Sequence, residues 1–157
     1  MRTFYLLSVY LHLLAVVFWL GGMLFLVVVA MPVLRKGDPA TMAWFLRQAA
    51  RRLRALGWCS LALLGLTGLF QLWVRNWLQS PLPWLVWAKL TLFGVILVLS
   101  AYHDFVLGPA TARAMESDPR GTQTARLRRR ASWMGRLTAL LALIMVGLGV
   151  MLVRGLP

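Results

Sequence analysis

Hydrophobic residues along this chain form four long runs separated by polar or basic segments. The first run, from Phe4 to Met31, has no acidic or basic residue and contains a single imidazole, that of His12. The other three cover residues 53–74, 82–107 and 131–153. A helix needs about 20 apolar residues to cross the hydrocarbon core of a bilayer. The pattern therefore predicts four membrane-spanning helices, at about residues 4–31, 53–74, 82–107 and 131–153.

Proline and glycine indicate where these spans end. Pro32 follows the first run and Gly108-Pro109 follows the third, and proline removes a backbone donor that a continuing helix needs. We therefore expect loops at residues 32–52 and 108–130, with residues 37–52 able to form a separate amphipathic helix on the membrane surface. The fold class that follows is an all-α integral membrane protein. Residues 1–157 form a single domain, an antiparallel four-helix transmembrane bundle.

The basic residues predict how the bundle is oriented. Thirteen of the 17 lysines and arginines lie in or beside the two long loops. The positive-inside rule then places both loops in the cytoplasm and both the N- and C-termini outside, in a bacterial-type inner (plasma) membrane. We interpret the formal net charge of +13 as a signal for topology and for contact with anionic lipid at the cytoplasmic face, and not as a nucleic-acid footprint.

Composition narrows the function classes. The chain is 61% hydrophobic and 13% charged, whereas soluble domains average about 25% charged residues. Hydrolase, phosphate-binding and zinc motifs (GxSxG, P-loop, CxxC and HExxH) are missing from the sequence, and the single cysteine excludes an intrachain disulfide. Tryptophans flank the short turn between the second and third spans, which predicts an aromatic belt at the membrane boundary. Together with the glycine-rich faces of the spans, these tryptophans would allow a homodimer. They are Trp73, Trp77, Trp84 and Trp87.

Depth along the spans groups the polar side chains into two levels. His12, Lys89, Met145 and Thr67 all fall roughly 9–12 Å from the outer end, at about 1.5 Å rise per residue. An unpartnered polar group in hydrocarbon costs several kcal/mol, so His12 and Lys89 are expected to face the bundle interior. His103 lies about 18 Å deeper than His12, which is too far for both imidazoles to bind one metal ion. Other soft metal-ligand candidates lie toward the His103 level: Met23, Met134 and Cys59.

Short apolar motifs resemble two membrane protein families. LHLLAVVFWLGG with Met23 and MPVLR in the first span, and RRLRALGW leading into LLGLTGLF in the second, resemble the copper-resistance CopD domain. AKLTLFGVILVLSAYH in the third span is closer to the HemJ-type protoporphyrinogen oxidases. The CopD resemblance implies copper movement or tolerance. The HemJ resemblance implies a b-type haem, with His12 and Lys89 matching that family's histidine and lysine.

Three functions remain open. The first is copper handling, with His12 and Met145 as an outer station and His103, Met23, Met134 and Cys59 as an inner one, because copper(I) favours thioether, thiolate and imidazole ligands. The second is a haem b protein or small redox enzyme, with His12 as axial ligand and Met145 or Lys89 opposite. The third is a non-catalytic scaffold, in which His12 bonds to Thr67 and fixes helix register. We favour the first.

Overall fold

The computed structural model describes residues 2–34, 36–76 and 83–154, and these are almost entirely helical. The elements are α1 (Arg2–Leu24), the π-helical turn η1 (Phe25–Ala30), α2 (Met31–Leu34), α3 (Pro39–Val74), α4 (Trp84–Tyr102), the π-helical turn η3 (His103–Leu107), α5 (Gly108–Ser117) and α6 (Thr122–Arg154). They join into four rods long and apolar enough to cross a membrane: Arg2–Leu34, Ala40–Val74, Trp84–Ser117 and Thr122–Arg154. The predicted all-α, four-span membrane fold is confirmed.

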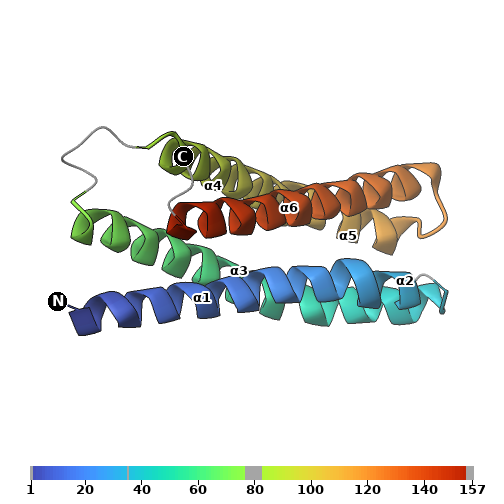
Figure 1. The fold of residues 1–157 in the computed structure, drawn as a ribbon. Coiled ribbons are helices and arrows are strands. Elements are labelled where there is room, and N and C mark those ends of the chain that lie inside the picture. Colours follow the sequence, from blue (N-terminus) through green and yellow to red (C-terminus); the bar gives the residue numbers. More distant parts are fainter. Residues whose placement is uncertain (1, 35, 77–82, 155–157) are drawn as a thin grey trace.

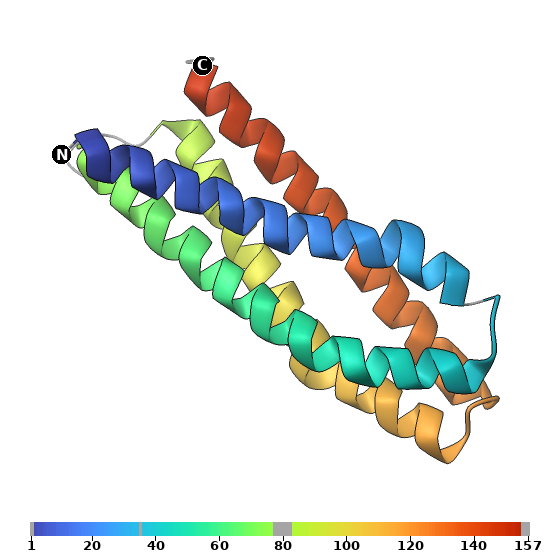
Figure 2. The ribbon, with the colours of Figure 1, turned by 90° about the horizontal axis from the view of Figure 1, so that it is seen from below.

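The four rods run antiparallel to their neighbours in sequence (Figure 1). α1 packs along α3, and α4 packs along α6, as two views at right angles agree (Figures 1 and 2). One buried cluster takes side chains from all four rods and joins the two pairs: Ala15, Trp19, Leu20, Leu61, Leu64, Ile96 and Ala142. Large apolar side chains cover the outside, such as Leu66 and Val98, which is the surface that lipid requires.

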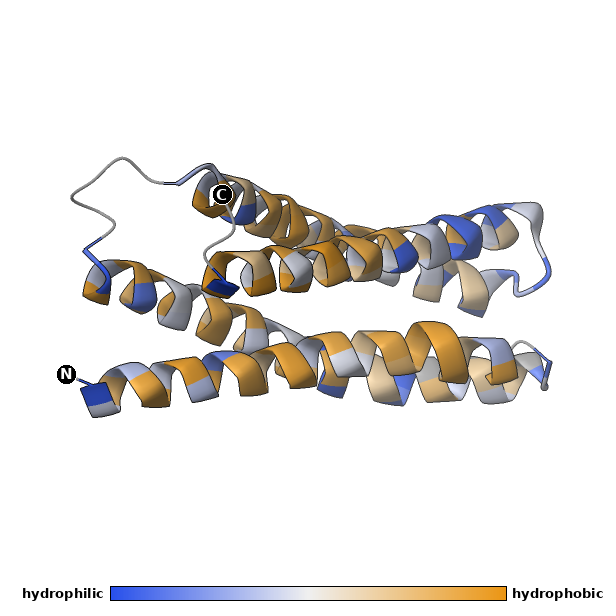
Figure 3. Cartoon of the chain, in the orientation of Figure 1, coloured by the Kyte–Doolittle hydropathy of each residue, from blue (hydrophilic) through white to orange (hydrophobic). Residues whose placement is uncertain are grey.

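Most of the basic residues lie at one end of the bundle (Figure 3). The arginine-rich start of α6 lies at this end, and the opposite end of the bundle holds the start of α1 and the end of α6 (Figure 3). This arrangement is what the sequence predicts for alternating spans. The placement of the basic end in the cytoplasm stays a prediction from the positive-inside rule.

Neither proline stops its helix as expected, because the helix runs on to Leu34 after Pro32 and to Ser117 after Pro109. Each proline is preceded by a π-helical turn, η1 before Pro32 and η3 before Pro109. A proline ring clashes with the carbonyl four residues earlier, which is that of Val28 in η1 and of Phe105 in η3. The wider π turn accommodates the ring without breaking the rod.

The predicted long loops are also mostly helical. Residues 39–52 do not form a separate surface helix, because they are the first part of the continuous 36-residue α3. The Asp38 side chain caps this helix by accepting from the Thr41 backbone N–H at 3.1 Å, and Pro39 occupies its first turn. Both signals start the helix well before the membrane. Within this part of α3, Met42 is buried and Trp44 is exposed.

The other end of α3 matches the sequence. α3 stops at Val74, and Asn76 has a φ of 55°, a left-handed conformation typical of the residue after a helix. Trp73, Trp84 and Trp87 are exposed on both sides of this turn, as a belt at the membrane boundary requires. Three features of the sequence analysis lie outside the described residues: Arg35, Trp77 and the predicted start of the third span at Leu82.

Candidate functional site

His12 forms the central polar contact between α1 and α3. Its Nδ1 atom lies 2.7 Å from Thr67 Oγ1. The Thr67 hydroxyl has one proton, which it donates back to the Leu63 carbonyl oxygen, so Oγ1 is left to accept from the imidazole. In the neutral form of the imidazole, this arrangement puts the proton on Nδ1 and the lone pair on Nε2. A histidine whose Nδ1–H is held in this way is set up to use Nε2 as a metal ligand.

Further polar side chains lie between α1 and α3, from His12 toward the start of α1 and the end of α3. Ser8 Oγ donates to the Thr67 carbonyl oxygen at 3.4 Å, and Arg75 Nε donates to Tyr5 Oη at 3.2 Å. Gln71 lies between them, and among the described side chains its Nε2 is buried with no hydrogen-bond partner. Residues 67, 71 and 75 are one turn apart, so they share a face of α3. Together with Tyr5, Ser8 and His12 they form a polar ladder along the α1–α3 interface.

Lys89 lies on the opposite pair of helices. It is half-buried on α4, and a Cβ atom built at Gly149 of α6 would lie 3.3 Å from its Nζ. Met145, one turn before Gly149 on α6, is partly buried and packs against the core cluster. The structure thus brings His12 and Thr67 into direct contact, with Lys89 held against α6.

Two glycines make room for these polar groups. A Cβ at Gly68 would lie 3.8 Å from His12 Cε1, and the absent side chain of Gly149 leaves space for the Lys89 amine. The sequence indicated these glycines only as sites of close helix packing. In the structure Gly68 faces the His12 ring and Gly149 faces the Lys89 amine.

The second histidine belongs to a separate network. His103 Nδ1 lies 3.0 Å from Asp104 Oδ1, and Trp58 Nε1 donates to Asp104 Oδ2 at 3.1 Å. The α3 partners of the two networks, Thr67 and Trp58, are nine residues apart, or about 14 Å along the helix. This agrees with the inference that one metal ion cannot bind both histidines. On the same helix as Trp58, the Arg54 guanidinium lies over the Phe105 ring, 5.7 Å from its centroid.

The predicted inner metal ligands are dispersed. Cys59 is exposed on the surface of α3. Met23 packs against the core cluster, and Met134 is half-buried on α6. Across residues 2–34, 36–76 and 83–154, no three His, Cys, Asp or Glu side chains gather to hold a metal. The group of residues around His12 is therefore the better candidate for a metal site.

Sequence reasoning missed Ser8, Gln71 and the Trp58–Asp104 bond. Ser8 and His12 are four residues apart, as are Thr67 and Gln71, and that spacing puts each pair on one helix face. Matching the two spacings across antiparallel spans would have revealed the ladder. The Trp58–Asp104 bond had no such signal, because it depends on the rotation of two helices about their axes.

Comparison with known proteins identifies the family. The model for Copper resistance protein D (CopD) matches residues 47–152. The chain belongs to the CopD family. An uncharacterized protein of Aquifex aeolicus (strain VF5) is 32% identical over 145 residues, which cover 92% of each chain. No solved structure matches. The CopD match supports a copper-resistance membrane protein, and it lends no support to the HemJ resemblance of the third span.

Proposed function

We propose that this CopD protein handles copper(I) within the membrane and that His12 Nε2 is a ligand in the path of the ion. The observation that carries the proposal is the 2.7 Å contact between His12 Nδ1 and Thr67 Oγ1. It supports the tautomer of a neutral imidazole that has its proton on Nδ1, in which the Nε2 lone pair is available to a metal ion. Copper(I) is a soft ion that accepts imidazole and thioether ligands, whereas hard cations favour oxygen.

The residues around His12 suit a passing ion better than a permanently held one. Met145, on the helix that also faces Lys89, is the soft donor that the sequence predicts at the same depth. Nothing in the described chain completes a cluster of three His, Cys, Asp or Glu ligands. A protonated Lys89 opposes a cation at His12, which shortens the time the ion is retained. Copper is therefore the cargo of this protein in the proposal, in keeping with a role in resistance.

The polar ladder has a positioning role in this proposal. Buried hydrogen bonds between spans fix their register, because a slip would leave polar groups unpaired in hydrocarbon. The Ser8 and Thr67 contacts therefore hold α1 at the height and rotation that direct His12 into the bundle. The His103 network performs a similar structural task where η3 meets α3.

Copper(I) competition on purified protein tests the proposal. The detergent-solubilised protein is titrated against a coloured copper(I) chelator under reducing conditions, as wild type, His12→Ala and the matched control His103→Ala. We expect His12→Ala to lose most of the binding and His103→Ala to retain it. A visible Soret band that disappears in His12→Ala would show that His12 binds haem and would contradict the copper proposal. If the protein binds neither copper(I) nor haem, and His12→Ala changes only its stability, His12 has a structural role and the protein is a scaffold.

A further inference from the structure

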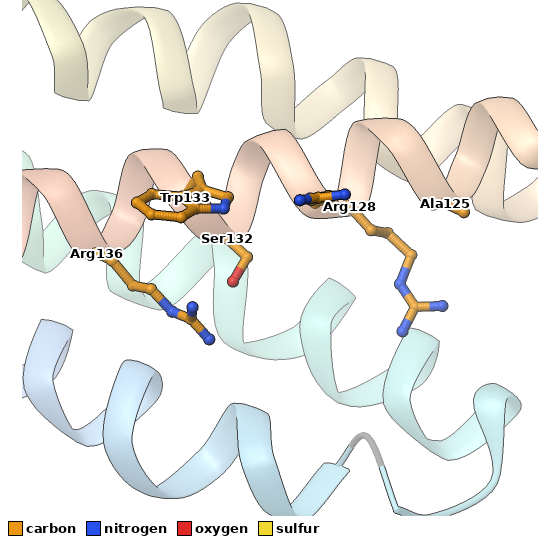
Figure 4. A pocket seen from close by; sticks show the side chains of 6 residues that line it. Ala125, Arg128, Ser132, Trp133 and Arg136 are labelled. Atoms are coloured by element: carbon orange, nitrogen blue, oxygen red, sulfur yellow. The ribbon is translucent and has the colours of Figure 1, made fainter.

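The first third of α6 carries a dense group of arginines around one tryptophan. Two shallow hollows lie on its surface, of about 350 Å³ and 310 Å³. Arg129 and Trp133 line both of them. The remaining lining residues are Ala125, Arg128, Ser132 and Arg136 in the first hollow and Arg126 and Arg130 in the second. Figure 4 shows the Arg136 and Ser132 side chains extending from the same side of α6.

These arginines have no counter-charge within the described chain. The sequence has 17 basic and 4 acidic residues, and the acidic ones are engaged elsewhere. Asp38 caps α3, Asp104 bonds to Trp58 and Glu116 pairs with Arg47 at 3.8 Å, while Asp118 lies in the turn that precedes α6. Within the ranges that the structure covers, no carboxylate pairs with an arginine of α6. The compensating negative charge must therefore come from another molecule.

The length of α6 places the arginines at the membrane boundary. α6 has 33 residues, and the hydrocarbon core takes only about 20 of them at 1.5 Å each. Counting back about 20 residues from Val153, at the far end, reaches Trp133. Trp133 is 62% exposed, and tryptophan prefers the headgroup level. Arg126 and Arg129 then lie just outside the hydrocarbon, where phosphate groups are found.

An exposed apolar stripe continues from Trp133 into the membrane. Trp133, Leu137, Leu140 and Ile144 are all exposed, and their spacings of four, three and four residues put them on one face of α6. Arg129 lies one turn before Trp133 at the head of the same stripe. The order along the helix is therefore guanidinium, indole and aliphatic side chains, which matches the phosphate, glycerol and acyl parts of a phospholipid.

We propose that this face of α6 is a binding site for one anionic phospholipid, with its phosphate at Arg126 and Arg129 and its acyl chain along Leu137, Leu140 and Ile144. Planar guanidinium groups bind phosphate oxygens in pairs of hydrogen bonds. A second copy of this chain would bring equal positive charge to the same face, so self-association there is disfavoured. The site is independent of His12 and does not rest on the copper proposal.

Native mass spectrometry of the detergent-solubilised protein tests the lipid site. Phosphatidylglycerol and phosphatidylcholine with the same acyl chains are added separately, and the bound lipid is counted. Removing one arginine near a phosphate lowers affinity about fivefold, so Arg126→Gln with Arg129→Gln should lower phosphatidylglycerol retention about 25-fold. The control removes the same charge from α3 through Arg51→Gln with Arg52→Gln, both exposed, and should have a much smaller effect.

Several outcomes would overturn the lipid site. Equal losses in the two double variants would show diffuse attraction without a site. Equal retention of the two lipids would show that only the apolar stripe binds lipid and that the arginines do not select its headgroup. Displacement of phosphatidylglycerol by millimolar inorganic phosphate would show a site for the free ion. Replacement of Arg126 and Arg129 by lysine keeps the charge and should retain most of the binding, and unchanged thermal unfolding without lipid shows that each variant is folded.

Discussion

Replacing Thr67 by valine isolates the contact that orients His12. Valine keeps the shape of threonine but removes the hydroxyl that accepts from His12 Nδ1 and donates to the Leu63 carbonyl. An imidazole N–H left without a partner in a buried place costs about 1–3 kcal/mol. Loss of such an orienting bond typically lowers metal affinity 10–100-fold. We therefore expect Thr67→Val to be less stable and to bind copper(I) at least about tenfold more weakly.

Thr138 provides a matched control on α6. It is buried like Thr67, and its hydroxyl donates to the Met134 carbonyl at 2.9 Å, within its own helix. Thr138→Val therefore loses the same local bond but no contact with an imidazole. Thermal unfolding in detergent and copper(I) competition on both variants, with Thr67→Ser as the conservative rescue, separate the two effects. Equal behaviour of Thr67→Val and Thr138→Val in both assays would refute the reasoning.

Substitutions at three other positions test the surroundings of His12 and the separate network of His103. Lys89→Met removes a positive charge, and two unit charges separated by roughly 10 Å repel by roughly 1–2 kcal/mol at an effective dielectric constant near 20. For a separation of that order, copper(I) should bind about tenfold more tightly, and unchanged or weaker binding would contradict this. Gly68→Ala adds a Cβ only 3.8 Å from His12 Cε1, an ordinary contact, and should leave copper(I) affinity within about twofold, whereas Gly68→Leu should displace the ring and lower it. Trp58→Phe removes the donor to Asp104 and should lower the free energy of unfolding by about 1–2 kcal/mol without changing copper(I) affinity; a loss of affinity would link the two networks.

The number of helices and their antiparallel alternation could be predicted from the sequence because hydrocarbon imposes one simple requirement. Every backbone polar group must be satisfied within the helix, so a run such as Phe4 to Met31 has few alternatives. The helix ends were harder to predict, since Pro32 and Pro109 stop an ordinary helix but are tolerated after a π turn. Such a turn depends on packing against neighbouring rods, which no local pattern encodes.

The site was predictable in height but not in rotation. Depth counting placed His12 and Thr67 at one level, and they are in contact in the structure. It also placed Cys59 toward the level of His103, yet Cys59 is exposed on the outside of α3. A difference of one residue turns a side chain by about 100° around the helix, so equal depth leaves orientation undetermined. Only the packing of α1 on α3 decides which polar side chains meet.

Nitrogen-15 NMR of histidine-labelled protein tests the central claim most directly. The chain has two histidines, so the His103→Ala variant leaves the His12 signals alone. We predict a proton on Nδ1 and a lone pair on Nε2 without copper, and a shift of the Nε2 signal when copper(I), a closed-shell ion, is added. A proton on Nε2, or an Nε2 signal that copper(I) does not move, would contradict the assignment of His12 as the intramembrane ligand.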